Sequence, residues 1–74
     1  MLVQCRRFNS IVEAARAENS LYDQWFFVPG VQVSTQVKER HDGACLILRS
    51  SNGLGLDDRQ VLLPGFAVCD PLQC

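Results

Sequence analysis

Residues 31–50 read VQVSTQVKERHDGACLILRS, and this stretch decides the fold. In its first part, apolar or β-branched side chains alternate with polar ones, which is the pattern of a half-buried antiparallel strand. One face holds Val31, Val33, Thr35 and Val37, and the other holds Gln32, Ser34, Gln36 and Lys38. The polar run at residues 39–43 ends in Asp-Gly, a strong signal for chain reversal. The continuous apolar run at residues 44–50 then predicts a central strand.

The segment before this hairpin predicts a strand and a short helix. Residues 2–8, LVQCRRF, are typical of a strand with one covered and one partly wet face. Ser10 and Glu13 form the capping box S-x-x-E, which marks a helix start. We expect a helix of about nine residues that ends at Asn19-Ser20, with residues 21–24 as a connection. A helix this short is marginal alone and has to dock on the sheet.

Two Pro-Gly pairs, Pro29-Gly30 and Pro64-Gly65, interrupt the remaining strand-like runs at residues 25–38 and 59–69. Proline cannot donate to a strand ladder, so both bends are expected at a sheet edge or corner. The surrounding segments, residues 21–33 and 56–68, resemble each other. Either both are simply apolar strands with a Pro-Gly bend, or they are a duplicated unit. Residues 51–58 form a Gly-rich loop, and residues 70–74 are expected to be a flexible tail.

These elements predict one small globular domain over residues 1–74. Its order is β-α-β-β-β, and its class is a small two-layer α+β fold with an antiparallel meander sheet and one short helix packed on one face. A chain of 74 residues holds one core. A net charge of -1 and a hydrophobic content of 47% exclude disorder. No apolar run approaches the roughly 18 residues of a membrane span, so no membrane association is expected.

The cysteines and the first ten residues bear on the compartment. Two arginines stand in MLVQCRRFNS where a signal peptide has its apolar region, so we expect no signal peptide and a cytoplasmic protein. The four cysteines Cys5, Cys45, Cys69 and Cys74 permit two disulfides in three connectivities. Their wide spacing and apolar surroundings favour reduced cysteines in the core.

The chemistry-bearing residues predict that the protein is not an enzyme. His41, the only histidine, lies in the polar turn. Asp57 and Asp58 are adjacent, so on a strand they would point to opposite faces. No C-x-x-C pair marks a metal site, and the G-x-G at Gly53 and Gly55 lacks the remaining residues of a phosphate loop. We therefore expect no catalytic, cofactor-binding or metal-binding residues, and no cofactor.

The aromatic cluster Trp25-Phe26-Phe27 suggests a contact surface. If Trp25 and Phe27 enter the core, Phe26 points outward beside Val28 and forms an apolar patch. The apolar residues exceed what one short helix can cover on one sheet face. Phe26, Val28 and one face of residues 44–50 are left over. A partner protein or a second subunit is expected to complete the domain.

We therefore predict a small non-enzymatic protein-interaction module of the adaptor or inhibitor type, such as phages and other mobile elements encode. It acts through a sheet face or edge, as a homodimer or on a larger protein. The candidate contact residues are Phe26, Val28, Gln32, Gln36, Arg6, Lys38 and Arg49. The alternative is a nucleic-acid-binding domain that uses Arg6, Arg7, Lys38 and Arg49. A pI near 5.6 disfavours that alternative.

Overall fold

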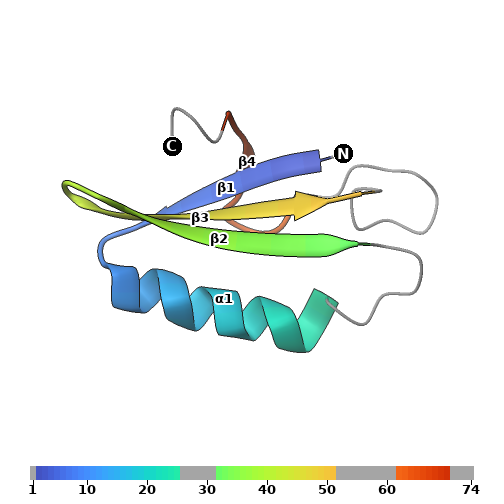
Figure 1. The fold of residues 1–74 in the computed structure, drawn as a ribbon, viewed down its shortest axis with the longest axis horizontal. Coiled ribbons are helices and arrows are strands. Elements are labelled where there is room, and N and C mark those ends of the chain that lie inside the picture. Colours follow the sequence, from blue (N-terminus) through green and yellow to red (C-terminus); the bar gives the residue numbers. More distant parts are fainter. Residues whose placement is uncertain (1, 26–31, 52–61, 71–74) are drawn as a thin grey trace.

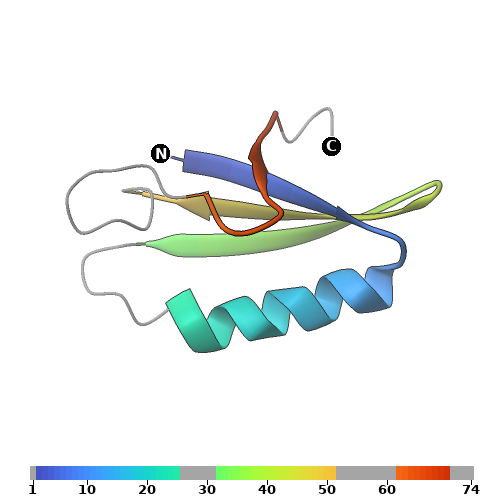
Figure 2. The same ribbon diagram turned by 180° about the vertical axis from the view of Figure 1, so that it is seen from behind.

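In the part of the chain that the structure describes, four antiparallel strands and one helix form two layers (Figures 1 and 2). The computed structural model describes residues 2–25, 32–51 and 62–70. The elements are β1 (Leu2–Phe8), α1 (Ile11–Trp25), β2 (Val33–Arg40), β3 (Gly43–Ser50) and β4 (Ala67–Val68). Helix α1 packs against one face of the sheet. The predicted two-layer α+β class is confirmed.

The strand order is β2-β3-β1-β4, which corrects the expected meander in one respect. Strands β2 and β3 form the predicted hairpin, with His41 and Asp42 in the turn. Strand β1 pairs with β3 along its whole length, from Leu2 opposite Ser50 to Phe8 opposite Ala44. Because β1 occupies that side of β3, the last strand pairs with the remaining edge of β1 instead.

Helix α1 has 15 residues and is longer than expected. Its start is as predicted: the Ser10 hydroxyl accepts a hydrogen bond from the Glu13 N–H at 3.3 Å. Asn19-Ser20 does not end it, and residues 21–24 are not a connection. Leu21 continues the buried stripe of Ala14 and is 8% exposed, so its burial outweighs the weak helix propensity of Asn19 and Ser20.

The helix also bears on two other expectations. Trp25 is the last helical residue, so the strand that follows begins at Val33 rather than at residue 25. Within the part of the chain that the structure describes, no helix combines the length and apolar character that a membrane span requires.

The last strand is much shorter than expected, because a turn interrupts it. The Phe66 N–H donates to the Leu63 carbonyl at 2.9 Å, and Gly65 has a φ of 80°, the conformation that the third residue of a type II turn requires. Leu63 enters the core, and within residues 62–70 only Ala67–Val68 pairs with β1, at the sheet edge. The Pro64-Gly65 bend thus lies at an edge as predicted. Residues 29–30, 59–61 and 71–74 lie outside the described residues.

Strand β3 is buried on both faces. Leu46 and Leu48 face α1 in a cluster with Leu21 and Leu63. On the opposite side, which we call the outer face, Ile47 is 0% exposed and packs with Cys5 and Cys45, while Val3 and Cys69 lie against them. The expectation that one face of residues 44–50 is left uncovered is therefore wrong.

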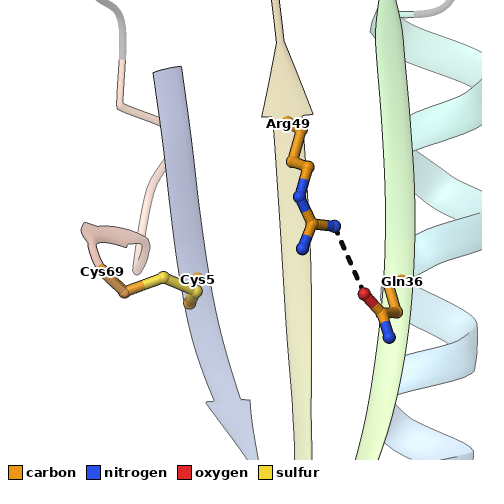
Figure 3. Close-up of a disulfide and its surroundings, with 4 residues drawn as sticks. All are labelled: Cys5, Gln36, Arg49 and Cys69. Carbon is orange, nitrogen blue, oxygen red and sulfur yellow. Dashed lines mark hydrogen bonds between the residues drawn. A yellow bond between two sulfur atoms is a disulfide. The ribbon is translucent and has the colours of Figure 1, made fainter. Parts of the chain in front are cut away.

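Two interactions attach the C-terminal segment to β1. The buried Gln4 side chain accepts a hydrogen bond from the Leu63 N–H at 2.9 Å. Cys5 and Cys69 form a disulfide, with Cα atoms 5.9 Å apart (Figure 3). Cys45 is disulfide-bonded as well. The expectation of reduced core cysteines is therefore wrong. Cys5, Cys45 and Cys69 do lie in apolar surroundings, as expected, but Cys5 and Cys69 are bonded to each other there.

The pairing of Cys5 with Cys69 can be tested by peptide mapping. Trypsin cleaves after Arg6 and Arg59, so a non-reducing digest should link residues 1–6 to residues 60–74. Mild acid cleavage at Asp70-Pro71 separates Cys69 from Cys74, and residues 1–6 should stay with residues 60–70. Recovery of residues 1–6 with an alkylated thiol, or attached to residues 71–74, would contradict the pairing.

Candidate functional site

The outer face carries three of the seven sequence-predicted contact residues, namely Gln36, Lys38 and Arg49. Strand alternation and register place Gln36, Ile47 and Cys5 side by side across β2, β3 and β1. The row toward the hairpin turn holds Lys38, Cys45 and Arg7, and the row on the other side holds Ser34, Arg49 and Val3. The centre of this face is thus apolar and buried, and its surroundings are polar and basic.

Basic side chains gather on the outer face. By alternation, Arg7, Lys38, Arg40 and Arg49 all belong to it. The Arg49 Nη1 donates to Gln36 Oε1 at 3.3 Å (Figure 3). Arg7 forms an exposed ion pair with Asp42 in the hairpin turn. Glu13 and Asp23 are exposed on α1, in the other layer. The near-neutral net charge therefore conceals a basic face and an acidic helix.

Arg6 does not belong to the basic face, which corrects the predicted patch. Its side chain is on the α1 side of the sheet, where its guanidinium carbon lies 4.8 Å from the centre of the Phe8 ring. There it lines a groove of about 350 Å³ between α1 and the turn after Leu63. The other lining residues are Ala17, Ser20, Leu21, Leu63, Pro64 and Phe66.

The backbone conformation beside this groove explains a glycine. A Cβ atom at Gly65 would lie 3.0 Å from Arg6 Nε, and the φ of Gly65 is itself in the left-handed region. The left-handed φ is what favours glycine, whereas the contact with the flexible Arg6 side chain could be relieved by a shift of a few tenths of an ångström. The groove thus follows from the turn that brings Leu63 into the core.

The free side of β2 is a second candidate surface. The Ser51 N–H donates to the Gln32 carbonyl at 2.9 Å, so Gln32 and Ser51 occupy a hydrogen-bonded position of the β2-β3 ladder. Hydrogen-bonded and non-hydrogen-bonded pairs alternate in antiparallel ladders. The N–H and C=O groups of Val33, Thr35, Val37 and Glu39 therefore point away from β3. No described strand pairs with that side of β2.

The remaining predicted contact residues are placed as follows. Gln32 is exposed just before β2. Phe26 and Val28 lie outside the described residues. Sequence reasoning missed Arg40, although alternation along the strand places it on the same face as Lys38. It also missed Tyr22, because residues 21–24 were expected to be a connection rather than helix. The Tyr22 hydroxyl lies 3.3 Å from the Thr35 hydroxyl, at the β2 edge.

The metal-ligating residue types are dispersed within the described ranges. There, no three His, Cys, Asp or Glu side chains come together in a group that could hold a metal ion. His41 is exposed in the hairpin turn. We find no match to this chain among protein families, curated proteins or solved structures.

Burial of the outer face can be tested at Ile47. Replacing a fully buried isoleucine with alanine leaves a cavity, so Ile47→Ala should lower the free energy of unfolding by about 2–5 kcal/mol. Val68→Ala is the control, because Val68 is 66% exposed and its truncation should change stability by about 0.5 kcal/mol or less. Urea unfolding followed by circular dichroism measures both. Equal, small losses would mean that the outer face is open.

Proposed function

We propose that this protein is a non-enzymatic protein-interaction module, of the adaptor or inhibitor type, that binds through the β2 edge and the adjoining outer face. The observation that carries the proposal is the length and chemistry of β2. It has eight residues at the edge of the sheet. The outward-pointing backbone groups at Val33, Thr35 and Val37 can accept an additional strand, which is a common mode of peptide recognition.

The charges along β2 favour one part of the edge. Proteins commonly protect exposed edges with charged side chains, lysine above all. In β2 these are confined to Lys38, Glu39 and Arg40, beside the hairpin turn. The segment Val33–Val37 has none. An added strand would therefore pair along Val33–Val37, and specificity would come from Ser34 and Gln36 on the exposed side.

The non-enzymatic part of the proposal is supported by the sequence and by the position of His41. The single histidine is in the exposed hairpin turn and does not line the groove beside Arg6. The sequence led us to expect the cytoplasm, whereas the Cys5–Cys69 bond favours an oxidising compartment. Of the two, the disulfide is the more direct argument, since disulfides rarely persist in cytosolic proteins.

Crosslinking of a chemically synthesised chain can test the proposed edge. Ligation at Ala44-Cys45 makes the 74-residue chain accessible to synthesis. A photoreactive side chain at Ser34, exposed on β2, should form an adduct with a partner protein in extracts of the source cells. The same group at Arg16, on the exposed side of α1, is the control.

The test becomes specific when Thr35 carries an N-methyl group, which removes an outward donor and leaves the β2-β3 ladder intact. The adduct at Ser34 should then be lost while the circular dichroism spectrum is unchanged. An adduct that survives N-methylation, or one that forms equally well from Arg16, would contradict recognition by the β2 edge.

A second candidate function rests on the basic outer face. Arg7, Lys38, Arg40 and Arg49 lie on one surface, although Arg6 does not. Phosphate contacts by such side chains dominate nucleic-acid affinity and make it salt-dependent.

Fluorescence anisotropy with DNA and RNA oligonucleotides over a salt series tests this alternative. If the outer face binds phosphates, the double variant Lys38→Gln/Arg40→Gln should reduce the slope of log K against log salt by about 1.4–1.8, the contribution of two phosphate contacts. Arg16→Gln should leave the slope unchanged. Binding without salt dependence, or equal effects of both variants, would exclude the basic face as the binding surface.

A further inference from the structure

The β2 edge is complementary to itself, and this points to its occupant. Val33, Thr35 and Val37 each direct one N–H donor and one C=O acceptor away from β3, and Thr35 is the middle residue of the three. An antiparallel copy of the same segment presents the same groups in the reverse order. We propose that a second copy of this chain pairs there, with Thr35 on the two-fold axis. The inference rests on the proposed function of this edge and names its partner.

The charges disfavour shifts of this register toward the hairpin turn. With Thr35 opposite Thr35 of the partner subunit, Val33 lies opposite the partner's Val37, and Ser34 lies opposite the partner's Gln36. Both pairings join side chains of like polarity across the strands. A shift that centred the contact on Lys38 would place two lysines opposite each other. A shift centred on Gln36 would place Val33 opposite the partner's Glu39.

Helix α1 presents a mostly apolar flank beside the same edge. Ile11, Ala15 and Tyr22 recur on one side of the helix, with intervals of four and seven residues, and the half-buried Glu18 lies on the same side between Ala15 and Tyr22. Ile11 is 45% and Tyr22 43% exposed, and Ala15 is exposed too. The hydroxyl contact between Tyr22 and Thr35 shows that this flank faces β2. The opposite flank, with Ser20, faces the groove beside Leu63.

Strand pairing would bring the two helices together on the same side of the joined sheet. Figures 1 and 2 show α1 running alongside β2. Neighbouring strands lie about 4.8 Å apart, so the two helices would flank the axis closely. Because Tyr22 contacts Thr35, it would lie near the axis and meet the partner's Tyr22. The strand edge and the helix flank thus form one continuous self-complementary surface.

Sedimentation velocity over a concentration series tests the dimer. The 8.3 kDa chain should sediment as a dimer that dissociates on dilution. Tyr22→Glu places two like charges near the axis and should weaken association by about a hundredfold. Val68→Glu is the matched control, because Val68 is a more exposed apolar residue at the opposite edge of the sheet. The Val68→Glu chain should associate as tightly as the wild-type chain.

Two further measurements keep the test decisive. If circular dichroism shows that Tyr22→Glu is unfolded, N-methylation of Thr35 replaces it and should abolish the dimer. In a sample that mixes isotope-labelled and unlabelled chains, intermolecular contacts between the α protons of Ser34 and Gln36 should report the register.

The outcomes separate this inference from the proposed function. A wild-type chain that stays monomeric throughout would overturn the dimer, and an edge-dependent adduct with another protein would still support the interaction module. A dimer with no other protein adduct would support the inference and overturn the adaptor or inhibitor role. A dimer that survives Tyr22→Glu, or is lost in Val68→Glu, would overturn this interface.

Discussion

The central strand β3 must be covered on both faces, and α1 covers only one of them. Leu46 and Leu48 lie against the helix, whereas Ile47 and Cys45 are equally buried on the outer face. Fully burying an aliphatic side chain is worth about 1.5–3 kcal/mol, a large share of the net stability of a small domain. The rest of the architecture serves to cover this strand, and the C-terminal segment contributes on both faces: Leu63 on the helix side and Cys69 on the outer side.

That segment is attached to β1 rather than extended along the sheet. Gln4 lies in the core, where an amide without partners would cost about 1–3 kcal/mol, and the Leu63 N–H satisfies its oxygen. The Cys5–Cys69 bond closes a loop across a sequence separation of 64 residues, which lowers the conformational entropy of the unfolded chain by the equivalent of about 4 kcal/mol. Because β1 lies next to β3, the C-terminal segment lies beside β1, where it forms both the hydrogen bond to Gln4 and the disulfide to Cys5. The departure from a meander and the disulfide therefore have one origin.

Sequence patterns predicted what depends on local periodicity. The alternation in β2, the Asp-Gly turn, the apolar run of β3 and the Ser10 cap all appear where expected. The errors concern tertiary contacts. Asn19 and Ser20 are weak helix formers, and only burial of Leu21 extends α1 past them. Nothing local indicates that Leu63 bonds to Gln4, or that β4 pairs with β1. The errors about the candidate site have the same cause. Arg6 alternates onto the face that the helix covers, and Tyr22 lies beside β2 only because the helix is longer than expected.

The two edges of the sheet therefore differ in kind. At the β1 side, a disulfide, a buried hydrogen bond and a tight turn close the edge, and of the described residues Ala67 and Val68 alone pair there. At the β2 side, the eight residues of the strand lie alongside the helix, and half of their backbone N–H and C=O groups point away from the sheet. Because the closed edge is needed to cover β3, a contact there would compete with folding. A contact at β2 would not compete with folding. Binding can therefore be added without loss of stability at the uncharged segment Val33–Val37, beside the flank of α1.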